Sequence, residues 1–333
     1  MKNYKKVAII GDGGWGTTLA ILLHKKGVRV NLWGVFPDYI EILKSKRENV
    51  KFLPGVKIPD DLFITSNLSE AAEDAETLVL VVPSQHMREV VARLKGLKAD
   101  KKYYLSASKG IENRTLMRMS EVIRDVLGSV QVGVLSGPTI SYEVARGFPT
   151  TVVAASEDED MAREIQDLFM TDSFRIYTNT DIVGVELGGS LKNVIAIAAG
   201  ISDGLGLGIN AKSALLVRGI VEIARLGAKM GARQETFFGI SGLGDLITTC
   251  VSPHGRNRWF GEEVGKGKKP EEVLKSTEMV VEGVGTAQSC YELSKKYDVE
   301  MPIAQQVYAV IYDGKNPKLA VRDLMTREKK AEV

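Results

Sequence analysis

The chain has 333 residues, of which 44% are hydrophobic and 26% charged, enough for two domains with sizeable cores. Because 44 basic residues nearly balance 42 acidic ones, the net charge of +2 gives no general reason to bind nucleic acid or an anionic membrane. The three His and two Cys are scattered without metal-ligand spacing, so no metal is expected. Cys250 and Cys290 are expected to be reduced, buried thiols, and a disulfide between them is the alternative.

The N-terminal segment, Met1–Lys6, is basic, but the apolar run after it, Val7–Ile10, is too short for the core of a signal peptide. No apolar run approaches the roughly 20 residues that a membrane-spanning helix needs. These features predict a cytoplasmic protein with no membrane span.

Short apolar runs alternate with helical stretches in the first half of the chain. They predict strands at 7–10, 28–33, 77–82, 103–106 and 132–135, and two more at 150–154 and 174–178 around a charged helix. Strands and helices in series are typical of an α/β domain with a doubly wound parallel sheet, the Rossmann fold.

Helical spacing dominates after Asn179, and no convincing strand follows. Helices are predicted at 183–202, 211–231, 271–275, 285–297, 304–312 and 319–325. We therefore expect an α/β domain over residues 1–180, an all-helical domain over 181–327 and a tail over 328–333.

A Gly-rich loop, Gly11-Asp12-Gly13-Gly14-Trp15-Gly16, follows the first strand and opens a helix. It matches G-x-G-x-x-G, in which Gly11 permits the tight turn, Gly13 lets the backbone approach a pyrophosphate and Gly16 lets helix and strand pack closely. The helix N-terminus adds free N–H groups and a partial positive charge. The loop, with Gly14 and Trp15, is predicted to bind a dinucleotide.

The end of the second strand leaves the choice of dinucleotide open. Such units usually carry an acid there that holds the adenine ribose. Here the strand ends Leu32-Trp33-Gly34-Val35-Phe36, with no acid before Asp38 and no Lys or Arg for a 2′-phosphate. Val35 therefore lies where the adenosine contact is expected, and the sequence does not decide between NAD and NADP.

Further motifs follow the Gly-rich loop in order. They are Phe52-Leu53-Pro54-Gly55, Val81-Val82-Pro83-Ser84, Ser108-Lys109-Gly110, Leu135-Ser136-Gly137-Pro138-Thr139, Glu186–Ala196, and Gly242–Cys250 with Arg256-Asn257-Arg258 shortly after. With these motifs the chain resembles bacterial NAD(P)-dependent glycerol-3-phosphate dehydrogenase over nearly its whole length.

The resemblance implies a dinucleotide-binding domain over 1–180 and a helical substrate-binding domain over 181–327, acting as a homodimer. It implies reversible hydride transfer between NAD(P)H and dihydroxyacetone phosphate. The product, sn-glycerol 3-phosphate, supplies phospholipid synthesis.

Lys192 is the candidate acid/base. It lies in a Gly- and Ala-rich helix, where a Lys must either extend to solvent or occupy a pocket. In a pocket, desolvation or a nearby cation would lower its pKa and allow proton exchange near neutrality. Asp245 lies in an apolar stretch and needs a partner, for which the Lys192 ammonium or a substrate hydroxyl is suited. A solvated helix Lys and a helix-capping Asp are the alternatives.

The other site residues come from the resemblance. Arg256 and Asn257 are implied to bind the substrate phosphate, and Gly255, where the family commonly has Ser, to offer its backbone N–H instead. Lys109, Asn193, Thr249 and the turn residues Gly137 and Thr139 are implied to contact the substrate. Lys109, Ser141, Arg256, Val280 and Glu282 are implied to contact the cofactor, and Trp15 to cover the nicotinamide or close the domain cleft.

Two other functions compete with this interpretation. Another Rossmann-plus-helical dehydrogenase, of the 3-hydroxyacid type, would use a His with a carboxylate, but neither His86 nor His254 lies in a comparable motif. A catalytically silent nicotinamide-binding sensor would keep the Gly-rich loop without Lys192 and Asp245, and both residues are present.

Overall fold

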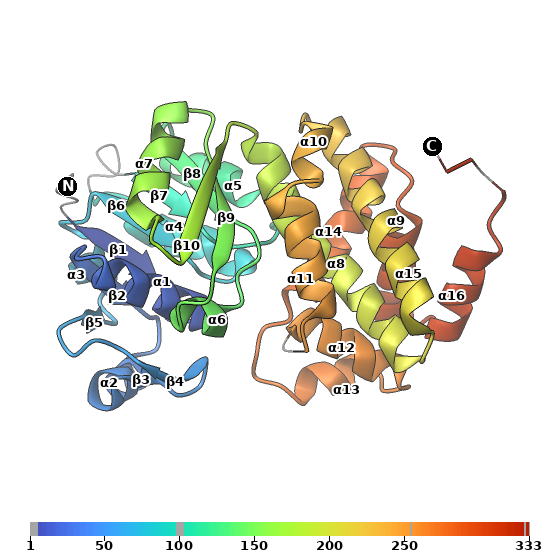
Figure 1. Ribbon diagram of the computed structural model, residues 1–333, viewed down its shortest axis with the longest axis horizontal. Coiled ribbons are helices and arrows are strands. Elements are labelled where there is room, and N and C mark those ends of the chain that lie inside the picture. The colour runs from blue at the N-terminus through green and yellow to red at the C-terminus, as the bar shows by residue number, and fades with distance from the viewer. Residues whose placement is uncertain (1–5, 98–102, 254, 330, 333) are drawn as a thin grey trace. The chain divides into compact units, whose positions relative to one another are not determined.

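The computed structural model describes residues 6–97, 103–253, 255–329 and 331–332. The chain divides into two compact units (Figure 1). The Rossmann unit comprises Met1–Glu112 and Met117–Glu186, and the helical unit comprises Asn113–Leu116 and Leu187–Val333.

An eight-stranded sheet forms the centre of the Rossmann unit, in the order β10-β9-β8-β7-β6-β1-β2-β5. Its strands are β1 (Val7–Ile10), β2 (Val30–Trp33), β5 (Phe63–Thr65), β6 (Thr77–Leu80), β7 (Tyr103–Ser106), β8 (Gln131–Ser136), β9 (Thr150–Ala155) and β10 (Phe174–Asn179). All the predicted strands are present, and β5 is additional. A small hairpin, β3 (Glu48–Asn49) with β4 (Leu53–Lys57), was also not predicted.

The sheet is mostly parallel, as predicted, but it departs from the prediction at one pair. β8 and β9 run antiparallel, with Leu135 opposite Ala154, whereas β9 and β10 are parallel to each other. The strands β9 and β10, at one end of the sheet, therefore point against the other six. Apolar runs locate strands but carry no information on their direction, so the pattern of residues could not reveal this reversal.

Helices cover both faces of the sheet because successive strand residues point to opposite sides. Val7 and Ile9 pack in one apolar cluster with α1 (Gly14–Lys25), α2 (Pro37–Lys46) and α7 (Glu159–Phe169). Ala8 and Ile10 pack in the other with α3 (Leu68–Ala72), α4 (Met87–Leu94) and α5 (Met119–Leu127). The short segments η1 (Ser84–His86) and α6 (Ser141–Ala145) follow β6 and β8.

The helical unit has no strand among its described residues. Its helices are most of α8 (Ile182–Gly204), α9 (Gly208–Lys229), α10 (Gln234–Phe237), α11 (Asp245–Val251), α12 (Arg256–Gly265), α13 (Pro270–Lys275), α14 (Glu282–Lys296), α15 (Pro302–Tyr312) and α16 (Pro317–Met325). One π-helical turn, η3 (Ile240–Gly244), leads into α11. Of the predicted tail, residues 328, 329, 331 and 332 lie outside helices, while Lys330, Val333 and also His254 are outside the described residues.

Contrary to the sequence-based expectation, one helix is long and apolar enough to span a membrane. This helix is α8, with a mean hydropathy of 1.5, but 89% of its most apolar stretch is buried inside the protein. A core helix of a folded domain has the same composition, since it is apolar on all sides.

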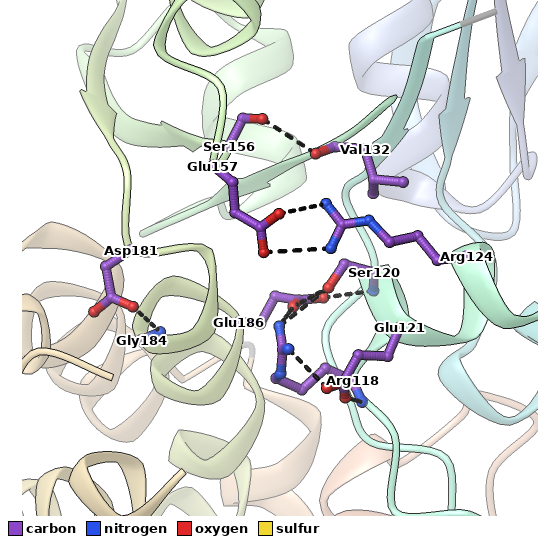
Figure 2. A network of polar contacts seen from close by, with 10 residues as sticks. All are labelled: Arg118, Ser120, Glu121, Arg124, Val132, Ser156, Glu157, Asp181, Gly184 and Glu186. Carbon is purple, nitrogen blue, oxygen red and sulfur yellow. Dashed lines mark hydrogen bonds and ion pairs between the residues drawn. The ribbon is translucent and has the colours of Figure 1, made fainter. Parts of the chain in front are cut away.

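The first turns of α8 belong to the Rossmann unit and are held there by a buried ion pair (Figure 2). Asp181 caps the helix by accepting a hydrogen bond from the Gly184 N–H at 2.9 Å. Glu186 accepts hydrogen bonds from Arg118 Nη1 at 2.5 Å, from Ser120 Oγ at 2.6 Å and from the Ser120 N–H at 2.8 Å. The helix that later carries Lys192 therefore starts from a fixed point beside α5.

Candidate active site

The Gly-rich loop lies where the strand order reverses, because β1 has β2 on one side and β6 on the other. Open α/β sheets bind ligands at this point, beyond the carboxyl ends of their strands. Gly11 has a φ of +127°, and a Cβ there would lie 2.5 Å from the Val81 carbonyl oxygen. A Cβ on Gly16 would lie 1.9 Å from the Gly11 carbonyl oxygen. The protein's own packing therefore requires both glycines.

The packing of the protein does not require a glycine at residue 13. Its φ of −63° suits any residue, and a Cβ there would meet nothing within 4 Å. A bare backbone that faces open space at a helix N-terminus leaves room for a phosphate group to approach the N–H groups of α1. This position is the strongest structural indication of a dinucleotide at the loop.

The neighbouring loop residues are packed against the Rossmann unit. A Cβ on Gly14 would lie 2.5 Å from the Phe52 carbonyl oxygen. Trp15 is half-buried, with its ring centroid 6.3 Å from that of Phe174. Val35 follows β2 and is exposed. The Trp15 ring thus packs within this unit.

Lys109 and the Gly-Pro turn form a polar cluster beyond the strands β7 and β8. Lys109 Nζ donates hydrogen bonds to the Gly137 carbonyl at 2.8 Å and to Thr139 Oγ1 at 3.3 Å. Gly137 has a φ of +143°, which favours glycine. Ser141 begins α6, and its carbonyl accepts a hydrogen bond from Thr18 Oγ1 of α1 at 3.1 Å. The cluster therefore adjoins the helix that the Gly-rich loop opens.

Lys192 is buried and paired in the helical unit. Its ammonium lies 2.5 Å from Asp245 Oδ1 and donates a second hydrogen bond to Thr249 Oγ1. The Lys192 side chain is 7% exposed and that of Asp245 only 1%. A solvated helix Lys is therefore excluded, and so is a capping Asp245, because Gly244 caps α11. The structure thus places the Asp245 carboxylate beside the Lys192 ammonium.

Close helix packing gathers these residues. A Cβ on Gly200 of α8 would lie 1.9 Å from the Arg258 carbonyl oxygen, and one on Gly261 of α12 would lie 2.0 Å from the Ile197 carbonyl oxygen. The backbones of α8 and α12 therefore touch, and only glycine allows this approach. Since Arg256 and Asn257 begin α12, the contact fixes them against the helix of Lys192.

The start of α12 offers two donors to an anion. Arg256 is exposed, and no described residue forms an ion pair or hydrogen bond with its guanidinium. Asn257 is buried, and its Oδ1 accepts a hydrogen bond from the Gly283 N–H at 2.9 Å, which turns its amide NH₂ the other way.

Arg258 and Gly255 have different surroundings. Arg258 Nε donates a hydrogen bond to Asp203 at 2.7 Å, so the Arg258 charge is already paired with a carboxylate. The N–H of Gly255, assigned to the substrate from the sequence, instead donates to the Ser252 carbonyl at 3.2 Å. A Cβ on Gly255 would lie 2.9 Å from the Thr249 carbonyl oxygen, so a serine here would require the loop to shift.

The remaining predicted contacts lie at the start of α14. Val280 is exposed, and Glu282 is the first residue of the helix. Asn193 lies beside this point, because a Cβ on Gly283 would be 2.8 Å from the Asn193 carbonyl oxygen. Cys250 is buried, and desolvation raises the pKa of its thiol to about 12, so it is not a nucleophile. Both cysteines are free and buried, as predicted.

A dinucleotide loop on an open sheet, and a buried ammonium held by a carboxylate in a helical unit, place the protein among the nicotinamide-dependent dehydrogenases. Two family models match the chain, the NAD-dependent glycerol-3-phosphate dehydrogenase N-terminus over residues 6–162 and C-terminus over residues 181–322. The chain therefore belongs to the NAD-dependent glycerol-3-phosphate dehydrogenase family, which makes it an oxidoreductase that uses NAD or NADP.

Known proteins agree over almost the whole chain. A relative from Prosthecochloris aestuarii, named glycerol-3-phosphate dehydrogenase [NAD(P)+], is 49% identical and covers 98% of this chain and 99% of its own. One of the same name from Bacillus cytotoxicus is 50% identical, with 98% and 97% covered. The crystal structure of glycerol-3-phosphate dehydrogenase from Coxiella burnetii matches with a TM-score of 0.94 at 37% identity, covering 97% and 99%.

Sequence reasoning missed two polar groups. The partner of Glu186, Arg118, lies 68 residues away, and nothing in the sequence connects them. Asp12 was treated only as a variable residue of the Gly-rich loop, whereas its carboxylate lies against Gly34, at the end of β2.

Proposed function

We propose that this protein catalyses reversible hydride transfer between NAD(P)H and dihydroxyacetone phosphate, giving sn-glycerol 3-phosphate for phospholipid synthesis. The observation that carries the proposal is the buried contact of Lys192 with Asp245 and Thr249, in a chain of this family. A silent sensor would need the Gly-rich loop but not the buried pair of Lys192 and Asp245, and this pair is present.

Lys192 is the proton donor in the reduction. When bound, NAD(P)H supplies a hydride to the carbonyl carbon, and the oxygen gains negative charge. The Lys192 ammonium donates a proton to that oxygen, and in the oxidation the amine takes the proton back. Asp245 and Thr249 hold Nζ in place through their hydrogen bonds, so that little reorganisation is needed during proton transfer.

The substrate phosphate is held at the start of α12. The Arg256 guanidinium has no partner among described residues and presents planar donors, and the Asn257 amide adds a further donor. Asn193 is proposed to add a polar contact from α8. On the Rossmann side, Lys109 with Gly137 and Thr139 is proposed to contact the substrate, and Ser141 the cofactor.

The test follows absorbance at 340 nm with dihydroxyacetone phosphate and NADH or NADPH, for wild type and Lys192→Ala. The variant should lose about 10²–10⁴-fold in kcat. Lys229→Ala, which removes an exposed lysine of α9, is the matched control and should retain activity. If Lys192→Ala reacted normally, Lys192 would lose its role. If wild type left this ketone untouched, the substrate assignment would fall.

Stability must be separated from catalysis, because Lys192→Ala leaves the Asp245 carboxylate buried without its counter-charge. The double variant Lys192→Ala/Asp245→Ala removes both charges. It should melt closer to wild type than Lys192→Ala alone while remaining inactive. Recovery of activity in the double variant would contradict the proposed proton transfer.

The proposal includes a homodimer and a cytoplasmic location. Support for the dimer comes from the family resemblance. Two free, buried cysteines suit a reducing compartment. Size-exclusion chromatography with light scattering tests the dimer, since a monomeric mass at micromolar concentration would contradict it.

A further inference from the structure

The second residue of the Gly-rich loop, Asp12, turns its carboxyl group toward the end of β2. A Cβ on Gly34 would lie 2.4 Å from Asp12 Cγ and 2.5 Å from Asp12 Oδ2. The carboxyl group therefore occupies the space that a side chain at residue 34 would need. The acid from the first loop and the glycine at the strand end fit each other.

No contact of the Asp12 carboxylate among the described residues accounts for an acid at this position. Asp12 Oδ2 is buried and has no hydrogen-bond partner among the described residues. The cap of α1 is Gly13, without a side-chain hydrogen bond, so Asp12 does not cap the helix. Burial raises the pKa of Asp12, and a hydrogen bond from its own backbone opposes this only in part. A half-buried acid with one buried, unsatisfied oxygen in a native protein calls for an explanation in terms of a ligand or function.

The location supplies that explanation. Dinucleotide-binding units hold the adenine ribose with an acid at the end of the second strand, about 20 residues after the Gly-rich loop. In this chain that position is occupied by Gly34 and Val35, which have no acceptor side chain. No Lys or Arg occurs between Gly34 and Leu43 to neutralise a 2′-phosphate. The residues fit an unphosphorylated ribose, with one acid nearby and no cation on this segment.

We propose that Asp12 determines cofactor specificity by taking the place of the missing strand-end acid and favouring NAD(H) over NADP(H). Its carboxylate accepts a hydrogen bond from an adenine ribose hydroxyl and repels the 2′-phosphate of NADP(H). Gly34 makes this possible because it leaves room for the carboxyl group. The inference rests on the proposed dehydrogenase function and specifies its cofactor.

The test measures binding of NADH and NADPH to the full chain by isothermal titration calorimetry, without substrate. Wild type should bind NADH at least about tenfold more tightly than NADPH, since one hydrogen bond to a charged group contributes that much to affinity. Asp12→Asn keeps the shape and removes the charge, and should reduce the preference to about threefold or less. Gly34→Ala should act in the same direction, because its Cβ displaces the carboxyl group.

Asp38→Asn is the matched control, since it removes the next acid along the chain, an exposed residue in the first turn of α2. It should leave the ratio of the two dissociation constants unchanged. Equal binding of NADH and NADPH by wild type overturns the inference, and so does an Asp12→Asn variant that keeps the wild-type ratio or weakens both ligands equally. Failure of wild type to bind either dinucleotide would instead remove the proposed function itself.

Discussion

Replacing Glu186 by alanine should destabilise the Rossmann unit by about 3 kcal/mol. Removing one partner of a buried ion pair costs about 3–5 kcal/mol, because the other charge stays buried. The side chains of Arg118 and Glu186 are 9% and 4% exposed. Burial lowers the pKa of Arg118, but the charges of Glu186 and Glu121 outweigh this and raise it overall. Arg118 keeps its 2.8 Å contact with Glu121, which puts the expected loss at the lower end of the range.

Thermal unfolding by differential scanning calorimetry measures this loss. In a domain of this size 1 kcal/mol shifts Tm by about 2–4 °C, so the transition should fall by about 6–12 °C. The double variant Arg118→Met/Glu186→Leu should recover most of the loss, since apolar side chains can replace a whole buried pair.

Glu157→Ala is the control, because it breaks a more exposed pair with Arg124 and should cost less than about 1 kcal/mol. A Glu186→Ala protein that melts within 2 °C of wild type (roughly the shift expected for 1 kcal/mol or less) would refute the reasoning. So would a double variant that is less stable than both single variants.

Two further predictions concern the helical unit. Glu222 of α9 is buried against the N-terminus of α15, where its carboxylate accepts hydrogen bonds from the Ile303 and Ala304 N–H groups. Desolvation raises the pKa of Glu222 from a usual 4.5 to about 7, although these hydrogen bonds lower it. The folded state therefore binds the Glu222 proton more tightly than the unfolded state does. As the pH rises from 4.5 to 7, the wild type should lose up to about 3 kcal/mol of stability relative to Glu222→Gln. Equal urea midpoints for the two proteins at both pH 5 and pH 8 would disprove this. Gly261→Ala places a Cβ 2.0 Å from the Ile197 carbonyl oxygen and should destabilise the protein by about 1–3 kcal/mol. It should also raise the KM for dihydroxyacetone phosphate, because the start of α12 moves. An unchanged Tm and KM would show that α8 and α12 tolerate separation.

Much of the fold could be predicted because strands buried on both faces are continuous apolar runs. Val7–Ile10 and Tyr103–Ser106 were located to the residue. The short strand Phe63–Thr65 was missed, since it is an edge strand of three residues with one exposed side chain. The start of α8 came one residue earlier than predicted, where Asp181 caps it.

The candidate site was predictable to a lesser degree. An acid in an apolar stretch needs a counter-charge, so Asp245 suggested Lys192 as its partner, and the structure puts them in contact. The partner of the Gly255 N–H could not be predicted in the same way, because its hydrogen bond to the Ser252 carbonyl depends on the conformation of the loop. The roles of the site residues in binding and catalysis remain predictions.

The sequence by itself determined the features that depend on neighbours along the chain. The place of the Gly-rich loop between a strand and a helix, and the long apolar helix of Lys192, could be predicted from the sequence. Both depend on glycine spacing and hydrophobic periodicity, which are patterns over a few neighbouring residues. Tertiary structure alone decided the direction of β9, the contact of Arg118 with Glu186 and the position of Asp12 against Gly34. Each of these joins residues distant in sequence, and such contacts depend on how whole elements pack, which local patterns do not encode.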